Sequence, residues 1–557
     1  MMSLSINNLI RLYGAPVSFC FDQATKDPKR VQEDLLMRIL QNNADSVFGK
    51  THKFSDIKTE TQYRKQIPIR DFEGYRHYIN HILSGEKRIL TVVDPIRFNV
   101  TSGTIDEPKY IPVTHKGLAQ ELNLIGQWYY RALRDHPRFL DYYRIAIVSP
   151  LNEGKTPSGI PYGNASGMMF NRIPKFIRHS YALPVCIFQI KNYEDRYFLI
   201  ARCALGKKIS FLLTPNPSTL IRLAEIMAKH AEEIIRAIFD GKAGRDLSEQ
   251  PEIRQSLSRL LTPNPERARY LEEILRTTST LRPLDVWPEL KLIACWLGGS
   301  VGVQAHKLSA FYGDTPLRDL GYMASEAHVT LPYEDNTPSG ILAIQTNYYE
   351  FIPEEAHGAQ NPPSLSCYEV KKGKRYAILL TTANGLYRYD INDIVEVTGF
   401  YNHTALLAFI RKGQDMTNIT GEKMHANHIL VAMEEARREF NLPLEQFRAS
   451  PDFENSRYCI YLELNKSVPD DILRDKVIPL IDRVLAKVNV EYAEKRKSER
   501  LNSPCLRIMK PGWSESICLK SIQSGKRDAQ FKWRLLCVGD DIGDNVNILK
   551  LIEIGKD

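Results

Sequence analysis

The amino-acid sequence predicts an α/β protein with a large N-terminal domain and a small α+β C-terminal domain. Short apolar runs typical of buried strands alternate with amphipathic helical patterns over the first 410 residues. A polar segment at 408–423 then separates this region from a remainder that reads as helix, strand, helix and strand. We therefore expect a large first part and a smaller second part, which meet near residue 410.

Composition and charge are those of an ordinary globular protein. Of the 557 residues, 43% are hydrophobic and 25% are charged, and the formal net charge is +8. This mild positive charge suits an anionic substrate, and no basic stripe with interleaved aromatic residues indicates a nucleic-acid partner. No run of 18 apolar residues predicts a membrane span, and the N-terminal residues lack a signal-peptide pattern.

Cysteine usage points to a reducing compartment. The nine cysteines are scattered without a CxxC pair, so they indicate neither a zinc site nor a redox pair. We expect a cytoplasmic protein without a membrane partner. No feature indicates its oligomeric state.

Two helices of the N-terminal region have clear start signals. Asp27 before Pro28 predicts one start, because aspartate caps a helix and proline suits its first position. Thr114 predicts the other. The expected apolar faces are Val31, Leu35, Leu36, Ile39 and Leu40 in the first helix, and Leu118, Leu122, Ile125, Tyr129 and Leu133 in the second.

The stretch Thr101–Thr114, TSGTIDEPKYIPVT, carries the strongest functional signal. Alternation in residues 97–100 predicts a strand before it, and residues 110–113 form a second β-prone run. The small polar residues at its start offer backbone and hydroxyl donors that can wrap phosphate oxygens, and Lys109 adds a positive charge. The stretch is not a Walker A loop. Taken alone, it would also suit a plain turn between strands.

Apolar runs and their flanking residues predict the middle region. Residues 143–150 read as a buried strand. Three runs between 182 and 214, ALPVCIFQI, YFLIARCAL and ISFLLTP, also predict strands. One helix is expected from Pro217 to a stop at Gly241, and another over residues 265–277.

Residues 290–297 predict a buried strand that ends in Gly298-Gly299-Ser300-Val301-Gly302. This pentapeptide matches G-x-S-x-G, the nucleophile elbow of α/β-hydrolases. Such an enzyme needs a histidine partner, and the candidates are His306, His328, His357 and His403. Gly298 and Gly299 also suit a wall on which an adenine base lies, and the downstream motifs favour this second interpretation.

Two further motifs precede the expected hinge. Tyr322-x-x-Ser325-Glu326 combines hydroxyl groups with a carboxylate, and Mg²⁺ prefers hard oxygen ligands. The segment GLYRYDINDIV contains Tyr389 and Asp393, and a carboxylate can accept hydrogen bonds from both hydroxyls of a ribose. Without context, the first motif suits a helix start and the second a β-hairpin.

The C-terminal region begins with AFIRKGQDMTNITGEK, which contains Arg411 and Lys412. The elements expected beyond it, in a βαβ-like order, are a helix at 427–440, a strand at 458–464, a helix at 471–488 and a strand at 506–509. His425 and His428 have no third ligand nearby, so we expect no metal site there. Near the end, Gln530-Phe531-Lys532 stands in a polar segment.

Together these motifs resemble the adenylate-forming superfamily and, within it, the Gretchen Hagen (auxin-responsive) acyl-acid amido synthetases. Four blocks are similar to the family pattern and stand in its order: TSGTIDEPKYIP, YMASE, GLYRYDINDIV and QFK. The resemblance covers residues 20–537. It implies an adenylate-forming-type large domain at 1–410, with mixed sheets and a barrel flanked by helices, a hinge at 411–422 and a small mobile C-terminal lid domain at 423–557.

The resemblance also implies the site, with ATP and Mg²⁺ as cofactors. The residues implied to bind the nucleotide are Thr101, Ser102, Gly103, Thr104, Lys109, Gly298, Gly299, Tyr322, Ser325, Tyr389, Asp393, Arg411 and Lys412. Glu326 is implied to hold Mg²⁺, Asp393 to bind the ribose, and Lys532 to neutralise the reacting carboxylate and the α-phosphate. Lys532, Glu326 and Ser102 form the implied catalytic set.

The implied activity has two steps. A small carboxylic acid attacks the α-phosphate of ATP, and an amine, expected from an amino acid, then displaces AMP to form an amide. Departures from the family pattern at Ile105, Asp390, Asn392 and Trp533 leave open an inactive scaffold or an unusual substrate. Asn392 replaces a glycine of the pattern, and asparagine is tolerable there if the turn needs a positive φ. Two further activities also fit the residues: an acyl-CoA-type ligase with a thiol acceptor, and a G-x-S-x-G serine hydrolase.

Overall fold

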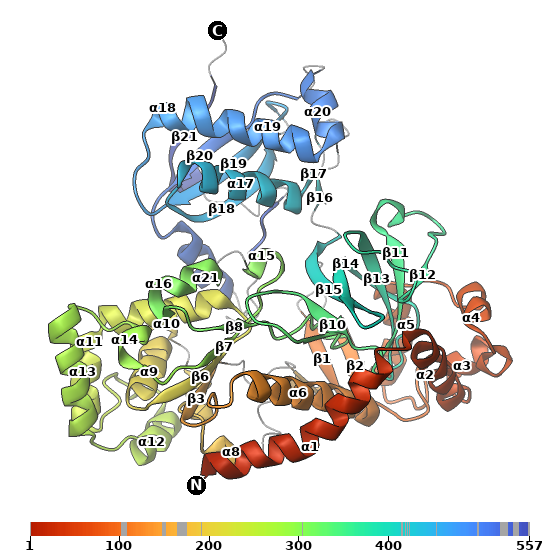
Figure 1. The fold of residues 1–557 in the computed structure, drawn as a ribbon, viewed down its shortest axis with the longest axis horizontal. Coiled ribbons are helices and arrows are strands. Elements are labelled where there is room, and N and C mark those ends of the chain that lie inside the picture. Colours follow the sequence, from red (N-terminus) through yellow and green to blue (C-terminus); the bar gives the residue numbers. More distant parts are fainter. Residues whose placement is uncertain are drawn as a thin grey trace. The chain divides into compact units, whose positions relative to one another are not determined.

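A computed structural model describes residues 2–101, 109–147, 152–163, 175–190, 192–302, 305–413, 416–417, 419, 422, 424–452, 454–497, 501–523, 533–537 and 545–554. The chain forms two compact units, Met1–Phe409 and Ile410–Asp557 (Figure 1). The first unit contains three sheets over its described residues, and the second contains a four-stranded sheet and a two-stranded ribbon. That residues 411–422 act as a hinge stays a prediction.

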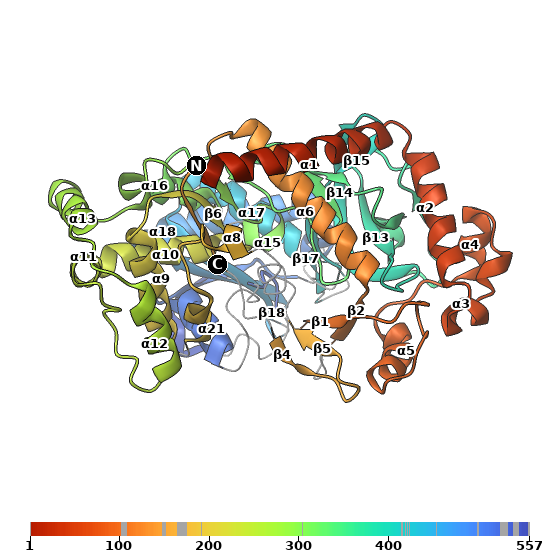
Figure 2. The ribbon, with the colours of Figure 1, turned by 90° about the horizontal axis from the view of Figure 1, so that it is seen from below.

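The first of the three sheets in the first unit is parallel. Its strand order is β3 (Tyr143–Ala146), β6 (Ile209–Leu213), β7 (Leu292–Ala294) and β8 (Leu317–Arg318). Ile293 faces a core shared with helices α9 (Tyr193–Leu205), α10 (Pro217–Lys229) and α11 (Ala231–Asp240). Leu292 faces the opposite core, shared with α1 (Met2–Ala24) and α6 (His115–Asp135). Helices therefore cover both faces (Figure 2), as parallel sheets require.

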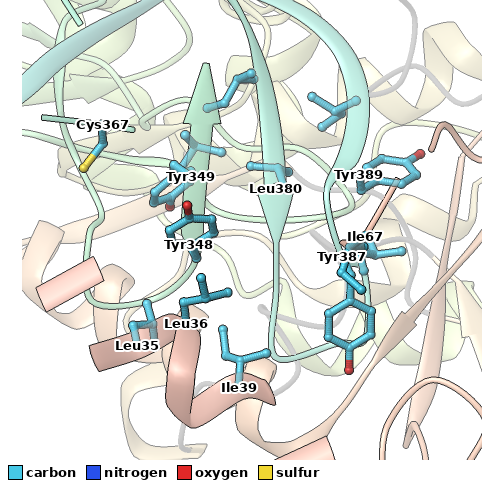
Figure 3. Close-up of a cluster of buried hydrophobic side chains, with 14 of the residues drawn as sticks. Leu35, Leu36, Ile39, Ile67, Tyr348, Tyr349, Cys367, Leu380, Tyr387 and Tyr389 are labelled. Atoms are coloured by element: carbon cyan, nitrogen blue, oxygen red, sulfur yellow. The ribbon is translucent and has the colours of Figure 1, made fainter. Parts of the chain in front are cut away.

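The second sheet of the first unit is antiparallel and has seven strands. Its order is β12 (Leu365–Ser366), β11 (Tyr348–Pro353), β13 (Arg375–Thr381), β14 (Tyr389–Tyr401), β15 (Thr404–Lys412), β10 (Gly340–Leu342) and β9 (Thr330–Pro332). One face packs on α2 (Pro28–Asn43), where Leu36 and Ile39 meet Tyr348 and Leu380 in a single apolar cluster (Figure 3). Asp27 caps α2 by accepting from the amide of Arg30 at 3.2 Å, which confirms the predicted start.

A smaller mixed sheet completes the first unit. Its order is β2 (Lys109–Val113), β1 (Arg97–Thr101), β5 (Pro161–Gly163) and β4 (Asn152–Lys155), with β1 parallel to β5. The remaining short helices are α3 (Val47–Thr51), η1 (Phe54–Asp56), α4 (Glu60–Gln66), α5 (Glu73–Leu83), α8 (Lys175–Arg178), η2 (Val185–Gln189), α12 (Pro251–Leu260), α13 (Pro265–Thr278), α14 (Pro283–Val286), α15 (Gly299–Gly302), η3 (Ala305–Lys307), α16 (Leu308–Tyr312) and η4 (Glu354–Ala356).

The second unit is built on the sheet β18 (Leu444–Asp452), β19 (Arg457–Leu464), β20 (Cys505–Met509) and β21 (Ile548–Ile552). Strands β19 and β20 are parallel, and α18 (Asp470–Ile472), η5 (Leu473–Val477), α19 (Ile478–Val488) and α20 (Val490–Lys497) connect them. This connection confirms the predicted βαβ order. The other elements are β16 (Met416–Thr417), β17 (Met424–His425), α17 (Ala426–Phe440), α21 (Trp513–Gln523) and η8 (Asn545–Asn547).

Two of the three apolar runs predicted as strands are helical, so that prediction was wrong. YFLIARCAL lies in α9, and ALPVCIFQI contains the 3₁₀ helix η2; only ISFLLTP forms a strand, β6. Residues 197–201 of helix α9 are all apolar, and all are buried because other elements surround this part of the helix. A surrounded helix and a buried strand give the same unbroken apolar run, so the pattern could not separate them.

Two other helices differ in detail from the prediction. The helix expected from Pro217 to Gly241 is two helices, α10 and α11, which meet at His230; Gly241 ends the second at φ +71°. In α6, Leu122 is 38% exposed, whereas Leu124 and Trp128 are buried. The buried face of α6 is rotated from the predicted one because α1 and the parallel sheet both cover the helix.

Candidate active site

The described site residues come from the three sheets of the first unit. They are Gly298 and Gly299 after β7, Tyr322, Ser325 and Glu326 after β8, Tyr389 and Asp393 in β14, and Thr101 and Lys109 in β1 and β2. The loops after β7 and β8 leave the carboxyl edge of the parallel sheet. Ligands of α/β sheets bind at such edges.

Tyr322 connects the loop after β8 to strand β14. Its hydroxyl donates to Oδ2 of Asp393 at 2.5 Å, and its ring stacks on Phe409 with the centroids 5.5 Å apart. Tyr322 is 7% exposed and Asp393 only 1%. Burial and the neighbouring carboxylate of Asp393 hold the pKa of Tyr322 well above its ordinary value. The hydroxyl is therefore a permanent donor that fixes the orientation of Asp393.

A second tyrosine makes the reciprocal connection. The hydroxyl of Tyr389 in β14 donates to Oε1 of Glu326 at 3.2 Å. Burial and the carboxylate of Glu326 raise the pKa of Tyr389. Two tyrosine–carboxylate bonds thus hold the loop after β8 against β14, and both carboxylates belong to the predicted site.

Strand β1 joins the same assembly through Asn99. Its side-chain amide donates to the carbonyl of Ser325 at 2.9 Å, and Arg97 donates to its side-chain oxygen. Thr101 lies two residues further along β1 and pairs with Lys109 across the hairpin. The ammonium group of Lys109 lies 5.5 Å from the ring centroid of Phe72. The strand that leads into the predicted phosphate loop is therefore hydrogen-bonded to the YMASE segment.

The glycines after β7 occupy positions where a side chain would interfere. A Cβ at Gly298 would lie 3.1 Å from the carbonyl oxygen of Phe409 and 3.2 Å from Cβ of Pro338. Gly299 has φ +61°, a conformation that favours glycine. Gly298 therefore lies next to the backbone carbonyl of Phe409, the residue whose ring stacks on Tyr322.

Sequence reasoning missed Asn99 and Phe409 as parts of the site. Asn99 is a polar residue between apolar Phe98 and Val100, and its burial to 4% exposure marks it as a constrained amide. An asparagine in a predicted half-buried strand was therefore a usable signal. Phe409 had none, because an aromatic residue in a strand looks the same whether it packs in a core or beside a ligand.

Several predicted residues cannot be placed. Ser102, Gly103, Thr104 and Lys532, together with Ile105, lie outside the described residues, as do the side chains of Thr101, Ser300, Arg411 and Lys412. Their roles stay predictions.

The described departures from the family pattern have structural partners. Oδ2 of Asp390 lies 2.9 Å from Nε2 of His357, and Oδ1 accepts from the amide of Asn392 at 2.7 Å. Asn392 has φ +57°, which confirms the expectation that asparagine accommodates a positive φ there. Trp533 is 8% exposed and donates to the carbonyl of Phe447 at 2.7 Å. Asp390 and Trp533 are therefore both hydrogen-bonded to other parts of the chain.

The donor chemistry of the site fits Mg²⁺. Within the described ranges, no group of three His, Cys, Asp or Glu side chains is arranged to hold a metal ion. Mg²⁺ in nucleotide sites usually takes one or two carboxylates together with substrate phosphates and water, so it needs no such group. Glu326 is a 9% exposed carboxylate held by Tyr389, which is a hard oxygen donor of this kind.

The same fold occurs in a solved enzyme structure. A 2-hydroxyisobutyryl-CoA ligase, solved in the postadenylation state with R3-HIB-AMP, has the same fold, with a TM-score of 0.51 at 12% identity. The likeness covers 92% of this chain and 89% of the ligase. The chain therefore has the same fold as this ligase, an α/β protein with several sheets flanked by helices.

The chain belongs to the GH3 family. Family models match as the GH3 family N-terminal domain over residues 20–317, the central domain over 340–412 and the C-terminal domain over 427–538. A solved GH3.15 acyl acid amido synthetase matches with a TM-score of 0.83 at 20% identity, covering 96% of each chain.

Curated relatives match along nearly the whole chain. The jasmonoyl–L-amino acid synthetase GH3.5 of Oryza sativa subsp. japonica is 25% identical, covering 92% of this chain and 93% of its own length. The indole-3-acetic acid-amido synthetase GH3.15 of Arabidopsis thaliana is 24% identical, covering 92% and 91%.

These findings confirm the predicted family, fold class and enzyme class, an AMP-forming amido synthetase of the adenylate-forming type. An acyl-CoA-type ligase with a thiol acceptor and a serine hydrolase are not favoured. No helix in the described part of the chain is long and apolar enough to cross a membrane.

Proposed function

We propose that this protein uses ATP to activate a small carboxylic acid and then joins the acyl group to an amino acid. In the first step a carboxylate oxygen attacks the α-phosphorus, the bond to the bridging oxygen breaks, and pyrophosphate leaves. In the second step the amine nitrogen attacks the acyl carbon, AMP departs with the carboxyl-derived oxygen, and the amine loses a proton. The named relatives, which act on jasmonate and indole-3-acetate, support a carboxylic acid and an amino acid as substrates.

The proposal depends most on the hydrogen bond between Tyr322 and Asp393. This bond holds a buried carboxylate beside Tyr322, whose ring stacks on Phe409, and the backbone carbonyl of Phe409 lies next to Gly298. A base needs an apolar wall and a ribose needs an acceptor for its hydroxyls, so we assign the base to Tyr322, Gly298 and Gly299 and the ribose to Asp393.

We assign the phosphates of the nucleotide to the C-terminal end of the YMASE segment, residues 325 and 326. Ser325 and Glu326 follow Tyr322, and Asn99 ties Ser325 to β1, whose end carries Thr101. We assign phosphate contacts to Thr101, Ser102, Gly103, Thr104, Lys109 and Ser325. Mg²⁺, when bound at Glu326, would supply positive charge to the triphosphate, and Tyr389 keeps the Glu326 carboxylate oriented.

We assign to the C-terminal region the positively charged side chains that contact the substrates during adenylation. Lys532 would neutralise the attacking carboxylate and the α-phosphate during adenylation, and Arg411 or Lys412 would contact the nucleotide. We propose that residues 411–422 form the hinge and that residues 423–557 form a lid, which moves to admit the amine after pyrophosphate leaves.

A pyrophosphate-release assay over a panel of carboxylic acids, with and without amino acids, tests the function. We expect acid-dependent pyrophosphate release with ATP, and an amide product that appears only when an amino acid is added. Replacing the amino acid by coenzyme A separates amide from thioester formation. Thioester without amide would assign a CoA ligase, and the absence of pyrophosphate release with every acid would contradict adenylation.

A further inference from the structure

The two loops to which we assign the nucleotide base begin at the ends of two neighbouring strands. Strands β7 and β8 are parallel, with Ile293 opposite Leu317 and Ala294 opposite Arg318. The chain then continues from β7 into Leu297 and Gly298, and from β8 into Gly321 and Tyr322. The relative positions of the loops therefore depend on what connects them just beyond the ends of the strands.

The carboxylate of Asp319 makes that connection. Oδ2 accepts from the backbone amide of Leu297 at 2.7 Å, and Oδ1 accepts from the amide of Gly321 at 2.6 Å. Leu297 immediately precedes Gly298, and Gly321 immediately precedes Tyr322. A single side chain thus bonds to the residue before each of the two assigned base contacts.

Two indoles reinforce this arrangement. Nε1 of Trp296 donates to the carbonyl of Gly321 at 3.1 Å, which is a second bond from one loop to the other. Nε1 of Trp128, in α6, donates to the carbonyl of Asp319 at 2.8 Å and so holds the backbone that carries the carboxylate. Asp319 is only 3% exposed, so water does not compete for these bonds.

We propose that Asp319 is a positioning residue for the nucleotide, because its carboxylate sets the spacing between the Gly298 loop and the Tyr322 loop. The inference rests on the proposed function, which assigns both loops to the base. Asp319 itself touches neither the base nor the reacting atoms; it acts through the backbone of Leu297 and Gly321.

The chemistry requires a carboxylate at this position. Each carboxylate oxygen accepts from a different backbone amide, and a carboxylate has only acceptors. An asparagine of nearly the same shape has one acceptor oxygen, and its NH₂ group would face the second backbone N–H donor. One loop would then lose its bond and shift relative to the other.

The test is Asp319→Asn, measured by acid-dependent pyrophosphate release at varied ATP and at about pH 8, where the Asp319 carboxyl group is ionised. We expect the KM for ATP to rise by about tenfold, equivalent to ~1.4 kcal/mol, with the KM for the acid unchanged and kcat altered by less than about threefold. A variant that was merely less stable would lose active enzyme, which lowers the apparent kcat and leaves the KM for ATP unchanged.

Asp335→Asn is the matched control. Its carboxylate accepts from Arg318, the residue next to Asp319, and lies 2.7 Å from Nε2 of His136, but it bonds to neither loop. We expect this variant to lower the melting temperature without changing the KM for ATP. An equal rise in that KM for both variants, or an unchanged KM in a folded Asp319→Asn protein, would overturn the inference.

If Asp319→Asn does not fold, Trp296→Phe tests the same spacing. It keeps an aromatic ring and removes only the bond to Gly321, so we expect a rise of about threefold in the KM for ATP. An unchanged KM in that variant would then count against the inference. Calorimetric titration of the wild type and the variants with ATP gives the same comparison without turnover. Wild-type protein that binds ATP and releases no pyrophosphate would contradict the proposed function alone.

Discussion

Arg388 forms an ion pair with Glu350 in which neither side chain is more than 7% exposed. Its Nη2 lies 3.0 Å from Oε1 and its Nε lies 3.0 Å from Oε2. The same guanidinium donates to the carbonyls of Arg64 and Ile67, both at 2.8 Å. The pair therefore connects the C-terminal end of α4 and Ile67 to strand β11 just before the start of β14, the strand that carries Asp393.

Removing the negative partner should destabilise the first unit. Glu350→Gln leaves a buried guanidinium without its counter-charge, and we expect the free energy of unfolding to fall by about 3–5 kcal/mol. Urea denaturation followed by tryptophan fluorescence measures the change. The control is Glu273→Gln, which breaks an exposed pair with Arg276 and should leave the free energy of unfolding nearly unchanged. Equal midpoints for the two variants would contradict this account.

Gly321 should tolerate no side chain. It has φ +92°, and a Cβ there would lie 2.4 Å from the backbone oxygen of Thr330 in strand β9. We expect Gly321→Ala to lose about 2–5 kcal/mol of stability, from backbone strain and the clash together. Gly373→Ala shares the strain, at φ +75°, but meets open space, and should lose about 1–2 kcal/mol. Thermal unfolding of the pair separates the clash from the strain.

The Tyr322 hydroxyl should matter for ATP and not for the acid. Tyr322→Phe keeps the ring on Phe409 and removes the bond to Asp393, so we expect the KM for ATP to rise about fivefold, within the range for a hydrogen bond to a charged group. Tyr333→Phe, at a tyrosine with no assigned nucleotide role, is the control. Steady-state kinetics with ATP and acid varied separately would refute the assignment if only the acid KM changed.

Asp319 should make stability depend on pH. Burial raises its pKa to about 7, although the amides of Leu297 and Gly321 act in the opposite direction. The unfolded chain releases this proton near pH 4, roughly the ordinary aspartate value. Between these values the folded protein binds more protons than the unfolded chain, so the free energy of unfolding should fall as pH rises from about 4 to 7, by up to ~1.4 kcal/mol per unit.

Comparison with Asp319→Asn isolates this effect, because the other titrating groups cancel in the difference. Denaturation of both proteins at several values between about pH 5 and 8 should show the wild type losing stability relative to the variant, with the difference becoming level above about pH 7. A constant difference over this range would show that the carboxyl group keeps the same charge throughout.

Substitution of Glu326 should change the Mg²⁺ concentration that the enzyme needs. EDTA should abolish acid-dependent pyrophosphate release, and added Mg²⁺ should restore it. Glu326→Gln should raise the Mg²⁺ concentration for half-maximal rate by about tenfold or more, whereas Glu355→Gln, at an exposed carboxylate, should leave it unchanged. An unchanged Mg²⁺ requirement in Glu326→Gln would remove the metal assignment while leaving the adenylation proposal intact.

The sequence by itself determined the local elements and the family. The caps at Asp27 and Thr114 and the stop at Gly241 depend on residues close in the chain, and all three were predicted. Asn392 has the positive φ that asparagine was expected to tolerate. The motif blocks led to the adenylate-forming class for the same reason. The helix α9 was missed because a surrounded helix and a buried strand share one apolar pattern.

Only the tertiary structure decided how the motifs meet. Tyr322 bonds to Asp393 across 71 residues, and Asn99 bonds to Ser325 across 226. Asp319 lies in a segment read for its other residues, and its bond to Leu297 exists only because β7 and β8 are adjacent strands. A sequence pattern records which donors and acceptors are present, but strand order and burial determine which of them become partners.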